Sequence, residues 1–260
     1  MLRPRIIPCL LVKNGGLVKT VNFTHPKYVG DPINAVKIFN EKEVDEMIVL
    51  DIDATAQNRE PDYGMIRNLA AECRMPLCYG GGVKSMEQVE RIISLGVEKV
   101  AMSSAAVGNL GIVAQAAKVV GSQSIVVVMD VKKTGRGSKY EVWTHNASKP
   151  TGMSPVDFAK QVENLGAGEV VINSIDCDGV MKGYDFGLVH EIREAISVPI
   201  TVLGGAGSLK DIAALIHAFG IIGAAAGSLF VFKGIYRAVL INYPSRAEKD
   251  ALVIHGHQNH

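Results

Sequence analysis

Residues 6–13 read IIPCLLVK, and residues 125–132 read IVVVMDVK. Both segments are apolar runs that end in lysine, and they lie 119 positions apart. Near-continuous apolar runs of this length are typical of parallel strands that are buried on both faces. The two segments therefore suggest that the chain contains two related halves, each with a buried strand of this kind.

Further matches between the halves occur at slightly different offsets, which requires only that loop lengths differ. At an offset of 125 or 124 residues, Asp51–Asp53 falls on Asp176–Asp178, Gly80-Gly81 on Gly204-Gly205, and Ser104 on Ser228. A repeat this long predicts a duplicated half that is built from four strand–helix units.

Strand-like and helix-like patterns alternate along the whole chain. Ser85–Leu95 has one apolar face, and Ser85 and Ser208 are typical N-cap residues. Eight alternations in about 250 residues predict a single (β/α)8 TIM barrel built from two duplicated half-barrels, spanning 1–250, with a polar tail at 251–260. The predicted strands are Arg5–Val12, Met47–Asp53, Pro76–Tyr79, Lys99–Ser103, Ser124–Val131, Glu169–Ser174, Pro199–Leu203 and Ile222–Ala226.

Composition excludes several classes of function. With 27 basic and 26 acidic residues the net charge is +1, which does not favour nucleic acid or an acidic membrane surface. No run approaches the ~18 apolar residues of a membrane span, and Met1–Pro8 has no signal-peptide pattern. We expect a cytoplasmic protein without metal or cofactor, whose cysteines are reduced; they are Cys9, Cys73, Cys78 and Cys177.

The repeat predicts two anion sites at the mouth of the barrel. Glycine pairs after strands 3 and 7, Gly80-Gly81 and Gly204-Gly205, would let backbone amides approach an anion closely. Ser104 and Ser228 follow strands 4 and 8 and could add hydroxyl groups. Two such sites suit an elongated ligand with a phosphate at each end, although the glycines could instead simply form tight turns.

The repeat also reveals an asymmetry in the predicted chemistry. Asp130 ends the fifth strand, where its carboxylate should face the mouth, and its counterpart in the first half is Leu11. Carboxylates from both strands could act as an acid–base pair, whereas leucine cannot carry a proton. We therefore expect chemistry that needs both groups to be strongly slowed.

Two connections are unusually long and emerge at the mouth, after the first strand (13–30) and after the fifth (132–150). Loops of this length at this face are candidate lids, or alternatively tolerated insertions. Within the second, Lys139–Thr144 alternates in a way that predicts a small hairpin.

Ordered motifs from about residue 3 to 232 resemble the cyclase subunit of imidazole glycerol phosphate synthase. They are RIIPCL (5–10), VKxxNF (18–23), GDP (30–32), LDI (50–52), GGG (80–82), GSQ (121–123), KPTG (149–152), DGxxxGYD (178–185) and GGAG (204–207). The resemblance implies a barrel that receives ammonia from a glutaminase at its N-terminal face and passes it through the centre. At the other face the ammonia would react with a bisphosphorylated nucleotide.

The resemblance also implies roles for individual residues. Asp130 would be a catalytic acid or base, and Lys19 a loop lysine that closes over substrate. Glu98 would face the glutaminase. The predicted phosphate-binding residues are Gly81, Gly82, Ser103, Ser104, Asp178, Gly179, Gly204, Gly205, Gly227 and Ser228. Arg5, Glu46, Lys99 and Glu169 would form a charged ammonia gate, or alternatively salt bridges that close the barrel bottom.

The departures from the family pattern decide between hypotheses. Leu11 stands where the family has its second catalytic aspartate, Thr20 replaces a glycine and Ser103 an asparagine. The stretch 10–23 resembles a divergent subgroup associated with sugar amidation for surface polysaccharide, in which ammonia passes to a separate sugar-modifying enzyme. The alternatives are a working cyclase that recruits Asp51 or Asp53, a related sugar-phosphate isomerase, and a phosphate-binding scaffold without catalysis.

Overall fold

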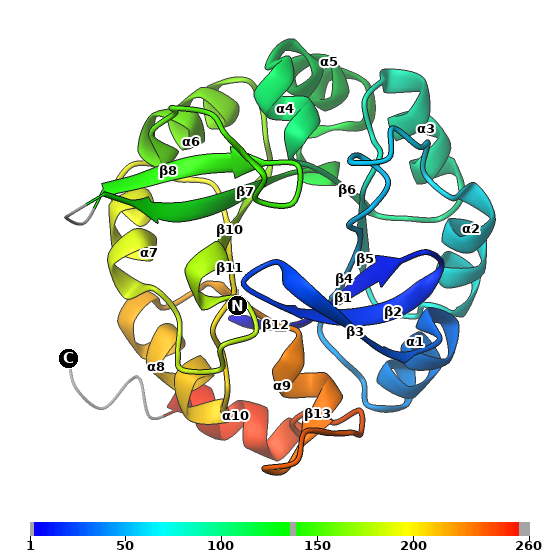
Figure 1. The fold of residues 1–260 in the computed structure, drawn as a ribbon, viewed down its shortest axis with the longest axis vertical. Coiled ribbons are helices and arrows are strands. Elements are labelled where there is room, and N and C mark those ends of the chain that lie inside the picture. The colour runs from blue at the N-terminus through cyan, green and yellow to red at the C-terminus, as the bar shows by residue number, and fades with distance from the viewer. Residues whose placement is uncertain (1–2, 136–138, 255–260) are drawn as a thin grey trace.

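The computed structural model describes residues 3–135 and 139–254, and within them eight parallel strands close into a barrel (Figure 1). The closing pair joins β10 to β7 and runs from Glu169 opposite Val126 to Ser174 opposite Val131. The predicted single (β/α)8 barrel is confirmed. Around the barrel the strands are β1 (Arg5–Lys13), β4 (Met47–Asp51), β5 (Leu77–Gly80), β6 (Lys99–Met102), β7 (Ile125–Thr134), β10 (Glu169–Ser174), β11 (Ile200–Leu203) and β12 (Gly223–Ala226).

Helices follow the barrel strands and form a ring outside them (Figure 1). Ser85 accepts a hydrogen bond from the Gln88 amide, and Ser208 forms a capping box with Asp211, so both predicted N-caps are confirmed. The helices are α1 (Pro32–Glu41), α2 (Tyr63–Glu72), α3 (Met86–Ser94), α4 (Ser104–Gly108), α5 (Gly111–Val120), α6 (Pro155–Asn164), α7 (Phe186–Arg193), α8 (Leu209–Phe219) and α9 (Ser228–Val231).

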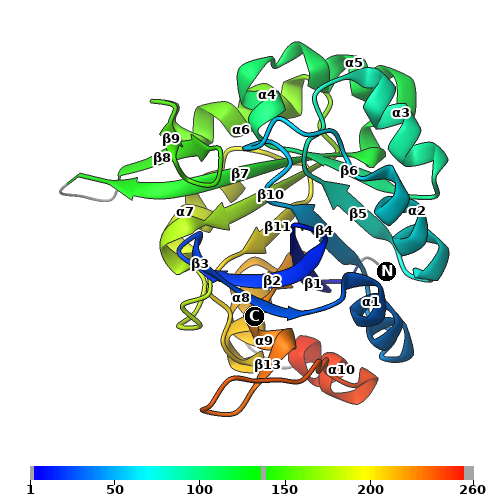
Figure 2. The same ribbon diagram turned by 45° about the vertical axis from the view of Figure 1, so that its right-hand side comes forward.

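Both long connections form antiparallel hairpins that lie across the mouth (Figures 1 and 2). The first, β2 (Gly16–Val21) and β3 (Thr24–Gly30), was expected only as a loop. In the second, β8 (Lys139–Thr144) pairs with an extension of β7, from Thr134 opposite Lys139 to Asp130 opposite Trp143. The predicted hairpin segment is therefore a strand, but its partner is the barrel strand itself.

The chain after α9 adds a short antiparallel pair, β13 (Phe232–Lys233) and β14 (Ala238–Val239), and then α10 (Arg246–Ile254). The helix α10 extends past residue 250, where we expected the tail to begin, and residues 255–260 lie outside the described residues. None of the helices in 3–135 and 139–254 is long and apolar enough to cross a membrane.

Two apolar regions hold the fold together. The larger lies between the barrel and its helices, where Leu10, Phe39 and Phe158 are fully buried. The smaller fills the barrel interior, and we call it the column: Ile7, Cys9, Ile48, Cys78, Ala101, Val126, Val128, Val171, Leu203 and Ala225. All four cysteines are free thiols. Because alternate residues of each strand point inward, the side chains directly above the column face the mouth.

Candidate active site

A pocket at the carboxyl ends of the strands brings together the predicted catalytic and phosphate-binding residues. Every barrel strand contributes to its lining, and Cys9, Ala101 and Val128 of the column form part of it. All ten predicted phosphate-binding residues line this pocket, together with Asp130, Lys19 and Leu11. The structure therefore brings together residues that are up to about 200 positions apart in the sequence.

The glycines after strands β5 and β11 are required by the chain's own packing. Gly81 and Gly205 both have φ of +119°, a conformation that favours glycine. A Cβ on Gly81 would lie 2.3 Å from the Asp51 carbonyl oxygen, and one on Gly205 would lie 2.0 Å from that of Gly183. The tight-turn interpretation therefore accounts for glycine at both positions, while their place in the pocket lining is what makes them candidates for anion binding.

Asp130 stands at the mouth beside a partner that the sequence reading missed. The Asn173 side-chain amide donates a 2.9 Å hydrogen bond to the Asp130 carboxylate, because β7 and β10 place the two residues directly opposite each other. Burial raises the pKa of Asp130 to about 7, while the bond from Asn173 opposes that rise. A carboxyl group that titrates near neutral pH can serve as either an acid or a base. The sequence could have indicated Asn173 as the partner of Asp130 only through the register of the predicted strands, because the two residues lie opposite each other on β10 and β7.

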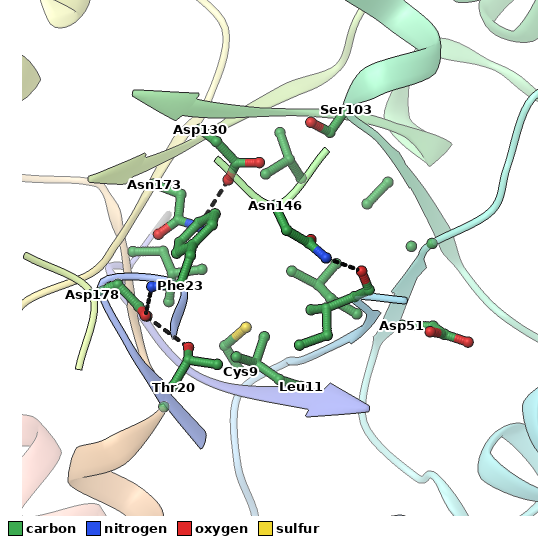
Figure 3. Close-up of a pocket in the computed structure, with 18 of the residues that line it drawn as sticks. Cys9, Leu11, Thr20, Phe23, Asp51, Ser103, Asp130, Asn146, Asn173 and Asp178 are labelled. Atoms are coloured by element: carbon green, nitrogen blue, oxygen red, sulfur yellow. Dashed lines mark hydrogen bonds between the residues drawn. The ribbon is translucent and has the colours of Figure 1, made fainter. Parts of the chain in front are cut away.

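Leu11 lies across the pocket from Asp130 (Figure 3). It packs with Leu50 against the top of the column, so this side of the pocket is apolar. One wall of the site thus carries an ionisable group, the Asp130 carboxyl with its partner Asn173. The opposite wall has leucine at position 11, which cannot carry a proton.

Lys19 and Asp178 link the first hairpin to the far side of the mouth. Lys19 is buried on β2, where its Nζ donates a 2.6 Å hydrogen bond to the Cys9 carbonyl, and burial lowers its pKa. Asp178 accepts hydrogen bonds from the Thr20 hydroxyl at 2.7 Å and the Phe23 amide at 3.1 Å (Figure 3). In this structure Asp178 therefore holds the hairpin, and a Cβ on the adjacent Gly179 would lie only 2.0 Å from the Thr20 carbonyl oxygen.

At the opposite end of the barrel, the four predicted gate residues form a closed ring of alternating charge. Arg5, Lys99 and Glu169 begin strands β1, β6 and β10, and Glu46 immediately precedes β4. Arg5 pairs with Glu46, and Lys99 pairs with Glu46 at 2.7 Å and with Glu169 at 2.8 Å. Glu169 returns to Arg5 at 2.8 Å and also accepts a hydrogen bond from the buried Thr201 hydroxyl. Every member of the ring thus contacts both of its oppositely charged neighbours.

Glu98 is exposed at the same end, one residue before β6. Its carboxylate accepts a 2.8 Å hydrogen bond from the Leu77 amide, and it immediately precedes Lys99 of the ring in the chain. Within 3–135 and 139–254, no group of three or more His, Cys, Asp or Glu side chains is placed to hold a metal ion.

The raised pKa of Asp130 should make the free energy of unfolding depend on pH. Its pKa is raised from 3.8 to about 7, so the folded state holds this proton more tightly than the unfolded state. The resulting stabilisation is complete below about pH 4 and is lost as the pH rises through 7. The free energy of unfolding of Asp130→Asn, minus that of wild type, should therefore be about 2 kcal/mol larger at pH 8 than at pH 4.5. This figure allows for the partial exposure of the carboxyl to the pocket. Denaturant unfolding at the two pH values measures this, and a pH-independent difference would contradict it.

Comparison with known proteins identifies the family. The model of a family described as histidine biosynthesis protein matches residues 5–236. A Leptospira interrogans protein, provisionally named imidazole glycerol phosphate synthase subunit HisF, is 56% identical over 252 residues, which cover 97% of this chain and 99% of the relative. Provisionally named subunits hisF3 of Vibrio vulnificus and hisF2 of Pseudomonas aeruginosa are 59% and 52% identical, and the alignments cover 96% and 94% of this chain and 96% and 97% of those relatives. The chain therefore belongs to the histidine biosynthesis protein family, among the HisF-type cyclase subunits of imidazole glycerol phosphate synthase.

Proposed function

We propose that this chain is the ammonia-conducting subunit of a glutamine-dependent complex that amidates a sugar for surface-polysaccharide synthesis. The observation that carries the proposal is the contrast between the two ends of the barrel. The charged ring and the apolar column are complete, whereas the mouth presents Asp130 opposite Leu11.

The lower half of the barrel supports conduction of ammonia. Ammonia is neutral and small, so it can cross an apolar region such as the column that would reject ions. In this structure the ring is closed, and its two cations are the most exposed members, with side-chain exposures of 28% for Arg5 and 18% for Lys99. A glutaminase docked beside Glu98 could displace one of these cations and open the ring.

The mouth supports a phosphate-bearing acceptor. Gly82, Ser103 and Ser104 lie on one side of the pocket, and Gly204, Gly227 and Ser228 on the other. Backbone amides and hydroxyls of this kind suit phosphate oxygens. The acceptor could be bound by this chain or shared with a separate sugar-modifying enzyme at the mouth.

The second candidate is a working cyclase subunit in histidine biosynthesis, which the family and the retained Asp130 favour. Its missing carboxylate would have to come from Asp51 or Asp53. Asp51 is already engaged, because it accepts the Asp53 and Ala54 amides at 3.0 and 3.1 Å and pairs with Arg59. Two relatives provisionally carry copy numbers, hisF2 and hisF3, which is consistent with roles beyond a single histidine pathway. The isomerase alternative would also need carboxylates on both strands, so Leu11 counts against it as well, and the retained Asp130 counts against the scaffold alternative.

The test uses the chain with a HisH-type glutaminase encoded in the same genome. We expect the two proteins to co-elute and Glu98→Lys to separate them, because the substitution reverses a charge at the proposed contact. We also expect imidazole glycerol phosphate to form from the bisphosphorylated nucleotide plus ammonium chloride about 10²- to 10⁴-fold more slowly than with an aspartate-containing cyclase. Cyclisation at the rate of an aspartate-containing cyclase would establish the second candidate instead. Failure to bind any such glutaminase would overturn the conduction proposal.

A further inference from the structure

Asp53 has a carboxylate oxygen that no group in the described part of the chain satisfies. The residue lies two positions after β4, lines the pocket and is only 5% exposed. Its Oδ2 atom is buried without a hydrogen-bond partner, and its Oδ1 lies 3.7 Å from the Lys13 ammonium. An unsatisfied buried acceptor is costly, so it calls for a donor that the structure does not contain.

The internal repeat shows how the same position is satisfied in the other half. Asp178 is the counterpart of Asp53 at the offset of 125, and its Oδ2 accepts hydrogen bonds from Thr20 and from the Phe23 amide. Thr144 is the counterpart of Thr20 at an offset of 124, but its hydroxyl pairs with the His145 ring at 3.0 Å. The Oδ2 atom of Asp178 is therefore hydrogen-bonded by its hairpin, while the Oδ2 atom of Asp53 has no partner among the described residues.

The tips of the two hairpins share a backbone conformation, but they contact the barrel at different carbonyl groups. Asn22 and Asn146 correspond at the offset of 124, and both have positive φ, 49° and 55°. Asn22 donates its side-chain amide across the mouth to the Ile175 and Asp176 carbonyls, and Asn146 donates to the Ile52 carbonyl at 2.6 Å. The second hairpin thus covers Asp53 without bonding to its carboxylate.

We propose that Asp53 is a specificity-determining residue of this pocket, and that its carboxylate accepts a hydrogen bond from a hydroxyl group of the phosphate-bearing molecule held there. A hydroxyl fits better than a cationic amine, because the Lys13 ammonium already stands beside the carboxylate. Asn173 Oδ1, on the far side of the pocket, is a second buried acceptor without a partner among the described residues, and it would take another hydroxyl. The proposal rests on the pocket being the acceptor site of the proposed function, and it specifies the chemistry of that acceptor.

A stability comparison separates this role from a structural one. Asp51→Ala should lower the Tm by about 4–8 °C, because two buried amides lose their acceptor. Asp53→Ala should leave the Tm within about 2 °C of wild type, because Oδ2 has no internal partner to lose. A loss for Asp53→Ala as large as that for Asp51→Ala would show that Asp53 is structural and would overturn the proposal.

The binding test uses two phosphate esters of equal chain length, erythritol 4-phosphate and butyl phosphate, with inorganic phosphate as the reference. By calorimetry, wild type should bind the polyol ester about 10- to 100-fold more tightly than the alkyl ester. Asp53→Ala should remove most of that preference and leave the affinity for inorganic phosphate unchanged. The proposal is overturned if wild type binds neither ester, if it shows no preference, or if the preference survives in the variant. This binding test involves no ammonia and no glutaminase. A negative result would therefore leave the proposal of ammonia conduction intact, and a negative glutaminase test would not affect the reading of the ester affinities.

Discussion

Glu169→Gln is expected to lower the free energy of unfolding by about 3–5 kcal/mol, the usual cost of removing one charged partner from a buried ion pair. Glu169 is 6% exposed and contacts Arg5, Lys99 and Thr201. Without its charge, two cations at the base of the barrel share the single carboxylate of Glu46. Chemical denaturation at neutral pH measures the loss.

The pH dependence of this effect has a defined direction. Burial opposes ionisation of Glu169, but the hydrogen bonds and charges of Arg5 and Lys99 outweigh burial and lower the pKa of the carboxyl below 4.5. A lowered folded-state pKa contributes stability that is present above the unfolded pKa and is lost as the pH falls. The difference between wild type and Glu169→Gln should therefore be constant above about pH 5 and shrink below 4.5.

A matched control is available in the exposed pair Arg3–Asp250, whose side chains are 70% and 45% exposed. Asp250→Asn should change stability by less than about 1 kcal/mol, because solvent screens the pair. If Glu169→Gln behaved like Asp250→Asn, the ring would not be a tightly coupled structure. In the proposed complex with a glutaminase, Glu169→Gln should also let ammonia escape, so that glutamine hydrolysis exceeds ammonia transfer.

Leu11→Asp is expected to raise ammonia-dependent cyclisation of the bisphosphorylated nucleotide by about 10²–10⁴-fold, the usual contribution of one general acid or base. The side chain at position 11 lies across the pocket from Asp130, as the two halves of an acid–base pair require (Figure 3). Asp130 supplies the other group, with a pKa raised to about 7 by burial. Steady-state formation of imidazole glycerol phosphate measures the gain.

Two companion variants give this experiment its meaning. Leu50→Asp adds a carboxylate to the same apolar wall, at a position where the family motif LDI has leucine, and should give no gain. Leu11→Asp combined with Asp130→Asn should return activity to the wild-type level, because the pair is again incomplete. No gain with Leu11→Asp alone would mean that the pocket has diverged beyond this one position.

Local pattern was enough to predict the strands, because a parallel strand covered on both faces must be apolar along its length. All eight predicted strands occur, and their ends lie within three residues of the expected positions. The first hairpin was missed because Lys19 and Thr20 are polar residues that become buried, at 4% and 5% exposure, only when β2 crosses the mouth. No periodicity marks a polar strand whose burial depends on contacts more than 150 residues away.

The amino-acid sequence by itself determined the barrel, its duplication and the residues that gather at each end, because strand burial, helix capping and internal repetition are local properties. Only the tertiary structure decided how those residues are paired. The charged ring closes because the first residues of β1, β6 and β10 meet Glu46, which immediately precedes β4, and Asn173 reaches Asp130 because of strand register. The Oδ2 atom of Asp178 is hydrogen-bonded while that of Asp53 has no partner among the described residues, because the two hairpins direct different groups toward these carboxylates. Hydrogen bonds between distant segments depend on ångström-scale geometry, which sequence spacing does not contain.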